Sequence, residues 1–545
     1  MKIKLLTQKL WRSVAAVVMV LGITAGYAPA AHAQTTPALL NPAPLRELYT
    51  KVNQGYLYST NWSEVVSAQK NYGLTMPSQR PLGYVFTAGN TDTKPIYRLK
   101  QNSTGNWIMS VDQGEINWLT SHGFTMEGLT GYIYTTAQYG AQQLNRYTNG
   151  KGWRLAYQSQ DSAMKSAGYT LDGPVGYMIP TYYQVGTYYF SAYDNNIPDT
   201  FLQAVKNYYG RYPDAWGGVR DFHGDPNSPW GNVPQNTQGW GGDWSYLKPT
   251  IGYYDDSQVS TLETQIDEAA SAGLSYFSFY EYWNNQTNTP QLDKALNAFT
   301  QASNTNRLKF TLSLVLPGSN NGDPEHLTLP TSQFSAAADA YANYFTKSNY
   351  LTTQEGRPIV FMLETGGIGS GSPTDVNNFI SLLKTDIKNK TGKDAYVMNE
   401  SENGLNTVSQ FTGDAYSCLN MGKYIVDGSY SEYVSDLPNY FKTFDNSGKP
   451  MMRCGMSGFN EAPRTGFWEA KSDVRYFKDD AKSQFPAAMT ATINNMKAQP
   501  ASPIDNYMTM YAWNEWHEGG IIEPNVRDGS YYLNNLQNTF GLPAH

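Results

Sequence analysis

The sequence is poor in charge. Only 16% of its 545 residues are Asp, Glu, Lys or Arg, whereas about a quarter is usual in soluble proteins. The formal net charge of −7 argues against a nucleic acid or an anionic membrane surface as a partner. The sequence also lacks a metal-type spacing of cysteine and histidine, a glycine-rich phosphate loop and a Gly-x-Ser-x-Gly turn. We therefore expect no metal, no cofactor and no nucleotide.

Cysteine is nearly absent. Cys418 and Cys454 are the two cysteines of the chain. An exported protein could form a disulfide between them, but they lie on separate predicted strands and need not come close enough to bond. We expect a buried pair of free thiols rather than a bridge.

Long apolar runs are also lacking, except near the N-terminus. Four basic residues among the first twelve precede an apolar stretch from Val14 to Gly26, and Ala31-His-Ala33 offers a cleavage site. This pattern predicts a secretory signal over residues 1–33. The alternative is a retained membrane anchor, which the shortness of the apolar run disfavours. The predicted mature protein is secreted, periplasmic or extracellular, with no membrane insertion after signal cleavage.

Aromatic residues, by contrast, are abundant. They make up 14% of the chain, with 42 tyrosines and 13 tryptophans. Together with the low charge and the frequent Asn, Thr and Gly, this composition is typical of proteins whose surfaces stack on sugars. It also disfavours intrinsic disorder.

After a predicted linker at residues 34–44, the chain repeats a pattern three times over residues 45–181. The units close with Gly83-Tyr84-Val85, Gly131-Tyr132-Ile133 and Gly176-Tyr177-Met178. Three such units predict a small β-rich domain with one helix per repeat, packed around a pseudo-threefold axis. This part resembles a threefold-repeat module of uncharacterised function found on secreted bacterial hydrolases, and it is a candidate carbohydrate-binding domain.

Three aromatic residues recur at equivalent positions of the repeats, namely Tyr56, Trp107 and Trp153. They are either platforms for sugars or part of the core that the repeats share. Both readings stay open at the level of the sequence.

Residues 182–545 alternate apolar strands with helical patterns. The expected strands are 186–192, 274–280, 309–316, 358–363, 395–399, 413–417, 450–456 and 507–512. Eight strands with helical crossovers predict a (β/α)8 TIM barrel with long loops, in the α/β class. A doubly wound open sheet is the competing fold, but no nucleotide motif supports it. We expect residues 214–244 to form a long loop over the mouth, either a substrate wall or a purely structural loop.

The last predicted strand ends in an unusual polar cluster. Trp513-Asn-Glu-Trp-His-Glu518 precedes Gly519-Gly520. Catalytic residues of such barrels lie where strands end, and two carboxylates three residues apart suit paired acid and base chemistry. A solvated loop pair is the alternative, but the flanking aromatic residues favour a cleft. Other strand ends are also polar or aromatic, at Tyr280–Trp283, Glu364, Asn399–Glu400 and Ser457–Arg464.

The cluster carries a family resemblance. Asn514 to Gly519, followed by Ile522-Glu-Pro524, resembles the catalytic motif of the retaining endo-α-mannosidase family of glycoside hydrolases. It is similar also to a bacterial family, the WbsX-like proteins, often labelled glycosyltransferases. Gly252–Asp255, Tyr280–Trp283, Gly356–Val360 and Gly458–Asn460 follow the same families. Asn460 departs from them, because relatives usually carry an aspartate there, and Leu316–Asn321 departs in a segment that bears on sugar specificity.

The resemblance implies an unusual mechanism with net retention. Glu515 would take the proton of the sugar's own 2-hydroxyl, giving a 1,2-anhydro sugar, and Glu518 would be the general acid and base. Asn514, His517 and Glu523 would orient them. The commoner mechanism with a glutamate nucleophile stays open, because i, i+3 spacing does not give the distance between the carboxylates.

Further residues are candidates for substrate contact or support. Aromatic faces stack on sugars, and arginine can clamp hydroxyls or an anionic substituent, and each of these residues also has a packing alternative. The candidates for substrate contact are Tyr254, Tyr282, Trp283, Arg464, Asn514, Trp516 and His517, with Glu523 and Asn460 behind them.

These observations predict a secreted, endo-acting, retaining glycoside hydrolase. Its substrate would be an α-linked polysaccharide or oligosaccharide, with mannan or another manno-configured polymer favoured. The alternatives are a glycosyltransferase of polysaccharide synthesis and a carbohydrate-binding protein without turnover. The predicted signal and the lack of a nucleotide-phosphate motif argue against the first, and the presence of both glutamates argues against the second.

Overall fold

The computed structural model describes residues 41–194, 215–216, 218–220, 244–318, 327–401, 404–420, 429–464, 475–477 and 480–545. The predicted signal, residues 34–40 of the predicted linker and most of the expected loop at 214–244 lie outside these ranges. Within them, no helix is long and apolar enough to cross a membrane.

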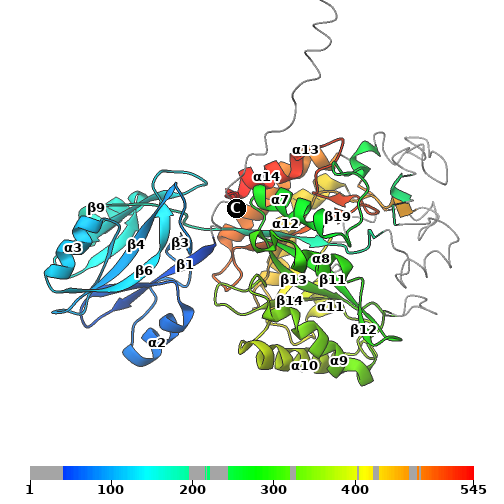
Figure 1. Ribbon diagram of the computed structural model, residues 1–545, viewed down its shortest axis with the longest axis horizontal. Coiled ribbons are helices and arrows are strands. Elements are labelled where there is room, and N and C mark those ends of the chain that lie inside the picture. The colour runs from blue at the N-terminus through cyan, green and yellow to red at the C-terminus, as the bar shows by residue number, and fades with distance from the viewer. Residues whose placement is uncertain are drawn as a thin grey trace, which may run out of the picture. The chain divides into compact units, whose positions relative to one another are not determined.

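The N-terminal region is an antiparallel, nine-stranded sheet built from three β-β-α-β units (Figure 1). In each unit the first strand pairs with the second and the last, and the last strands of successive units pair with one another. The elements are β1 (Pro42–Thr50), β2 (Gly55–Ser59), α2 (Trp62–Tyr72), β3 (Gly83–Phe86), β4 (Thr93–Gln101), β5 (Trp107–Ser110), α3 (Gln113–Ser121), β6 (Phe124–Tyr134), β7 (Gln142–Thr148), β8 (Trp153–Tyr157), α4 (Asp161–Ser166) and β9 (Thr170–Met178). The predicted β-rich repeat domain is confirmed.

The repeats meet at three equivalent positions, which hold Gly55, Asn106 and Gly152. The side-chain amide of Asn106 donates to the carbonyl oxygens of Asn53 (3.0 Å) and Lys151 (2.7 Å), which belong to the other two repeats. A Cβ atom at Gly55 would lie 2.1 Å from Oδ1 of Asn106. The centre of the domain therefore has room for one side chain, which the middle repeat supplies.

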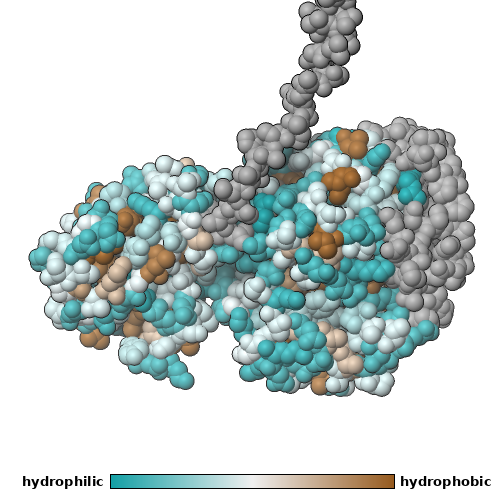
Figure 2. Space-filling view, viewed as in Figure 1, coloured by the Kyte–Doolittle hydropathy of each residue, from teal (hydrophilic) through white to brown (hydrophobic). Residues whose placement is uncertain are grey.

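The recurring aromatic residues pack between repeats. Tyr56 is buried in the central core, Trp107 packs against the apolar cluster under α2, and Trp153 packs against the cluster under α3. These contacts favour the core reading over sugar platforms. On the face drawn in Figure 2, apolar residues of this domain lie in small groups among hydrophilic ones.

The described residues from Gln184 onward form the predicted (β/α)8 barrel. Its eight parallel strands follow the order β16-β15-β14-β13-β11-β10-β18-β17, with helices on the outside (Figure 1). The strands are β10 (Gln184–Tyr189), β11 (Tyr276–Asn284), β13 (Lys309–Val315), β14 (Ile359–Glu364), β15 (Tyr396–Ser401), β16 (Ala415–Cys418), β17 (Arg453–Met456) and β18 (Tyr507–Tyr511). The helices are α7 (Val259–Ser271), α8 (Lys294–Gln301), α9 (Phe334–Ala342), α10 (Pro373–Thr391), α11 (Leu405–Val408), α12 (Tyr430–Asp445), α13 (Ala481–Ala498) and α14 (Tyr531–Phe540).

Local signals set the helix ends. In α10, the Ser372 hydroxyl accepts a hydrogen bond from the backbone N–H of Asp375, and Pro373 occupies the first turn. Gly392, at φ 71°, ends the helix, because glycine adopts this left-handed conformation without steric cost.

One end of the barrel is filled by side chains. A buried cluster at the N-terminal ends of the strands includes Tyr276, Ile359, Tyr396, Ala415 and Tyr507. Since this end is packed, the catalytic end expected of such a barrel is the opposite one, where the strands terminate.

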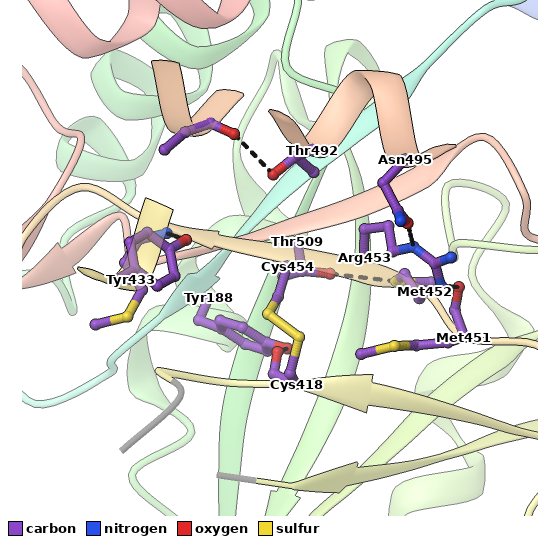
Figure 3. Close-up of a disulfide and its surroundings, with 12 residues drawn as sticks. Tyr188, Cys418, Tyr433, Met451, Met452, Arg453, Cys454, Thr492, Asn495 and Thr509 are labelled. Carbon is purple, nitrogen blue, oxygen red and sulfur yellow. Dashed lines mark hydrogen bonds between the residues drawn. A yellow bond between two sulfur atoms is a disulfide. The ribbon is translucent and has the colours of Figure 1, made fainter. Parts of the chain in front are cut away.

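A disulfide closes the barrel. Within the described residues, a single β-bridge joins Tyr416 of β16 to Met451, two residues before β17. The Cys418–Cys454 disulfide joins the two strands themselves, with 5.6 Å between the Cα atoms (Figure 3). The expectation of free thiols was wrong. Barrel closure brings the first and last strands of the order side by side, a proximity that the spacing of the cysteines in the sequence does not reveal.

Candidate active site

Both candidate glutamates lie on one turn at the C-terminal end of β18. The chain leaves β18 and forms a short hairpin from β19 (Asn514–Glu515) and β20 (Gly520–Ile521). Inside the hairpin, the N–H of Glu518 donates to the carbonyl of Glu515 (3.1 Å). Glu515 is buried and Glu518 is half-buried. The two carboxyl groups therefore belong to one compact, hydrogen-bonded turn.

Asn514 ties this hairpin to the end of β10. Its Oδ1 accepts from the backbone N–H of Phe190 (2.8 Å), and its Nδ2 donates to the carbonyl of Phe190 (2.9 Å). The side-chain amide of Asn514 thus accepts from and donates to the backbone of Phe190, as the backbone of a paired strand would. Asn514 was predicted to touch substrate, but in this structure it fixes the position of Glu515.

A buried network lies behind the turn. The carboxyl group of Glu523 accepts from the Tyr254 hydroxyl (2.9 Å) and from Nε2 of Gln265 (2.8 Å). The Tyr254 oxygen in turn accepts from Nε1 of Trp516 (3.2 Å). Burial raises the pKa values of Glu523 and Tyr254 well above their usual values. The sequence indicated Tyr254 and Trp516 as substrate contacts, whereas here their polar atoms bond to each other.

Tyr193 supports the other side of the turn. Its hydroxyl accepts from the backbone N–H of Trp516 (3.2 Å) and lies 3.4 Å from Nδ1 of His517. The rings of Tyr193 and His517 are nearly parallel, 7° apart, with 5.8 Å between their centroids. The N–H of Tyr193 donates to the carboxylate of Asp256 (3.0 Å). His517 is therefore oriented by its neighbours in the fold.

Glu518 is held from the barrel side. The Tyr511 hydroxyl donates to the Glu518 carboxylate, and the N–H of Asn460 donates to the Glu518 carbonyl (2.5 Å). The Asn460 side chain accepts from the N–H of Ala462 (2.9 Å). Asn460 therefore supports Glu518 through its backbone, a contact that does not depend on the identity of its side chain.

Tyr282 and Trp283, two candidate substrate contacts near the end of β11, point to opposite sides of the strand. Successive side chains of a strand alternate between its faces, and Tyr280 stacks on Tyr188 inside the barrel, with 5.7 Å between ring centroids. Tyr282 follows Tyr280 on that face and is mostly buried. Trp283 lies on the helix-facing side, where its ring packs against Tyr341 and its Nε1 donates to Gln333 (2.7 Å).

The predicted role of Trp283 as a substrate contact is therefore not supported. Glu281 shares the helix-facing side and is fully buried, so it does not belong to the wet mouth expected at the end of this strand. Arg464 is the last residue of a short 3-10 helix, Ala462–Arg464, and its side chain lies outside the described part of the chain.

The sequence did not single out Tyr193, Asp256, Gln265 or Tyr511. Tyr193 follows the first strand and Tyr511 ends the last, so the strand-end argument could have found both. Gln265 lies in α7, whose apolar pattern gave no reason to expect a polar side chain directed inward. Among the described residues, no group of three or more His, Cys, Asp or Glu side chains could hold a metal ion.

Two segments of the chain match models of known protein families. A family model described as glycosyltransferase WbsX matches residues 220–536, and a model described as a domain of unknown function, DUF5648, matches residues 44–179. No protein with a curated description matches the chain.

Three solved structures illustrate what the fold is similar to. One is described as a glycoside hydrolase-like protein, with 13% identity, a TM-score of 0.45, and coverage of 66% of this chain and 94% of that chain. Another is the GH99 endo-alpha-mannosidase from Bacteroides thetaiotaomicron, with 13% identity, a TM-score of 0.42, and coverage of 65% and 96%. A third is a GH5-4 broad specificity endoglucanase from an uncultured bacterium, with 11% identity, a TM-score of 0.32, and coverage of 55% and 88%.

Proposed function

Since the chain belongs to the family described as glycosyltransferase WbsX, we propose from its active-site turn that it is an enzyme acting on glycosidic bonds. Specifically, we propose a secreted, endo-acting, retaining glycoside hydrolase. Its substrate is an α-linked polysaccharide, with mannan or another manno-configured polymer favoured.

The observation that carries the proposal is the pair Glu515 and Glu518 on one turn at the C-terminal end of β18. Most glycoside hydrolases use two carboxyl groups, one to protonate the leaving oxygen and one to act at the other face or on a neighbouring group. Asn514, Tyr193 and Tyr511 hold the turn by direct hydrogen bonds. Such support keeps catalytic groups in a fixed geometry.

In the proposed reaction, Glu515 takes the proton of the sugar's 2-hydroxyl while O2 attacks the anomeric carbon. Glu518 protonates the departing oxygen as the glycosidic bond breaks, which leaves a 1,2-anhydro sugar. Glu518 then takes a proton from water, the water oxygen opens the ring at the anomeric carbon, and Glu515 returns its proton to O2. The two displacements give net retention. In an α-mannoside, O2 is placed for this attack.

Hydrolysis is favoured over glycosyl transfer by two features of the sequence. It carries no glycine-rich phosphate loop to hold a sugar nucleotide. Its N-terminal pattern predicts export, whereas sugar nucleotides are cytoplasmic. The family's label alone does not decide between the two, because function depends on the site rather than on the fold.

The test is a reducing-end assay of the purified protein on α-mannans, α-rhamnans, α-glucans and bacterial exopolysaccharides. We expect oligosaccharides from one of these polymers. Glu515→Gln and Glu518→Gln each remove a group that transfers a proton in the transition state, so each should lower kcat by about 100-fold or more. Glu355→Gln is the matched control, because Glu355 precedes β14 at the packed end of the barrel.

Two further measurements separate the alternatives. A substrate whose reacting sugar lacks the 2-hydroxyl should resist cleavage; efficient cleavage would favour a glutamate nucleophile instead. Polymer binding that is equal in all variants, without any cleavage, would favour a binding protein, and transfer from a sugar nucleotide would favour a glycosyltransferase.

A further inference from the structure

A cavity of about 360 Å³ adjoins the catalytic turn. Its walls come from the exit of β17 (Ser457–Asn460), the hairpin (Gly519 and Ile521), the start of α13 and the segment that precedes α14. Gly519 directly follows Glu518, and Asn460 donates its N–H to the Glu518 carbonyl (2.5 Å). A ligand bound in this cavity would therefore contact the hairpin that carries Glu515 and Glu518.

One wall of the cavity carries an unsatisfied hydroxyl group. Ser457 is 1% exposed, and within the described parts of the chain its Oγ has no hydrogen-bond partner. A buried polar group without a partner costs about 1–3 kcal/mol. A ligand hydroxyl bound in the cavity would supply the missing partner.

The charged side chains that line the cavity are two carboxylates, Asp480 and Asp528, and two cations, Lys482 and Arg527. The buried carboxylate of Asp528 accepts from Lys482 (2.7 Å) and from Arg527 (2.8 Å), so its charge is compensated. The Arg527 guanidinium lies over the ring of Tyr246, 4.2 Å from its centroid. Asp480 caps the N-terminus of α13 and accepts from the N–H of Lys482 (3.0 Å). The lining thus has no surplus of carboxylates that would select a cation.

Aromatic side chains complete the lining. Trp244, Tyr246, Phe459, Phe477 and Tyr532 all contribute to it, and Trp244 stacks with Tyr246 at 6.1 Å between centroids. Sites for small organic ligands combine apolar and aromatic walls with a few directed polar groups, in cavities of about 300–1,000 Å³. A neutral sugar ring, with apolar C–H faces and hydroxyl edges, fits such a lining.

We propose that this cavity is an additional sugar subsite, which binds a neutral hexose unit of the polysaccharide beyond the unit that is cleaved. The inference rests on the proposed function for the identity of the polymer. The Ser457 hydroxyl and the charged groups around Asp528 hold the sugar's hydroxyl groups. Longer chains reach the subsite and shorter ones do not.

The test compares chain lengths. For the parent, kcat/KM on α-linked mannooligosaccharides should rise from two units to six. Ser457→Ala removes only the hydroxyl group, so it should lower the value for the long substrates roughly tenfold, as expected for one lost hydrogen bond, and leave the shortest substrate unchanged. Lys482→Met, at the edge of the cavity, should act in the same direction. Ser260→Ala, which alters a different cavity, is the matched control.

Calorimetric titration of Glu518→Gln with the same oligosaccharides separates this inference from the proposed function. If the parent cleaves nothing but longer chains bind more tightly, and adding Ser457→Ala removes that gain, then the subsite holds and the hydrolase proposal fails. If cleavage occurs and Ser457→Ala changes long and short substrates alike, the subsite is wrong. A length dependence equal in all variants also overturns it.

Discussion

Glu281 carries its carboxyl group on the helix-facing side of β11, where it is 0% exposed. Among the described residues neither oxygen has a hydrogen-bond partner, and burial, together with nearby Asp293, raises the pKa of this group well above its usual value. The folded protein therefore keeps a proton that the unfolded chain releases near pH 4.3. The stability that Glu281 contributes is complete below that pH and is lost as the pH rises toward the folded pKa.

Glu281→Gln should remove the loss of stability at high pH, because an amide stays neutral at every pH. We expect the free energy of unfolding of the variant, relative to the parent, to rise between pH 4.5 and pH 8, by about 1.4 kcal/mol for each unit of the pKa shift that lies in this range. Urea unfolding at both pH values measures the difference. Glu432→Gln, at an exposed position in α12, should give no such trend. A difference that stays constant with pH would show that Glu281 is ionised in the folded protein.

The same residue shows what the sequence could and could not predict. The strand was predicted over residues 274–280 because this run is apolar and aromatic, with Tyr280–Trp283 at its end, whereas β11 continues to Asn284. That composition hides the face on which each side chain lies, since both faces of the strand are buried. The placement of Glu281 and Trp283 at the mouth failed for this reason.

At the scale of elements, the strands and their order along the chain were predictable from apolar runs, and polar strand ends located the turn with Glu515 and Glu518. The side chains that hold this turn come from distant segments. Tyr193 lies 322 positions before Glu515, and Gln265, which holds Glu523 behind the turn, lies 250 positions before Glu515, so only the folded barrel brings them together. The closure of the barrel, which brings β16 and β17 together, likewise depends on the complete fold rather than on neighbouring sequence.

That closure leads to a prediction about the Cys418–Cys454 disulfide, which joins residues 36 positions apart. Loop-closure entropy for this separation gives about 3–4 kcal/mol of stabilisation. The double variant Cys418→Ala/Cys454→Ala should lose about this amount of unfolding free energy, as measured by urea unfolding. Dithiothreitol should lower the midpoint of the parent toward that of the variant and leave the variant unchanged. Equal midpoints for the oxidised parent and the variant would mean that backbone contacts close the barrel unaided.

At the scale of the whole molecule, the repeat domain and the barrel have separate apolar cores, so each should unfold in its own calorimetric transition. Gly55→Ala places a Cβ atom 2.1 Å from Asn106 Oδ1 at the centre of the repeats, and such overpacking costs about 1–3 kcal/mol. The transition of the repeat domain should fall by several degrees, while that of the barrel and the hydrolysis of short oligosaccharides stay unchanged. Gly173→Ala is the matched control, because nothing lies within 4 Å of the added atom. A shift of both transitions together would mean that the two cores unfold as one cooperative unit.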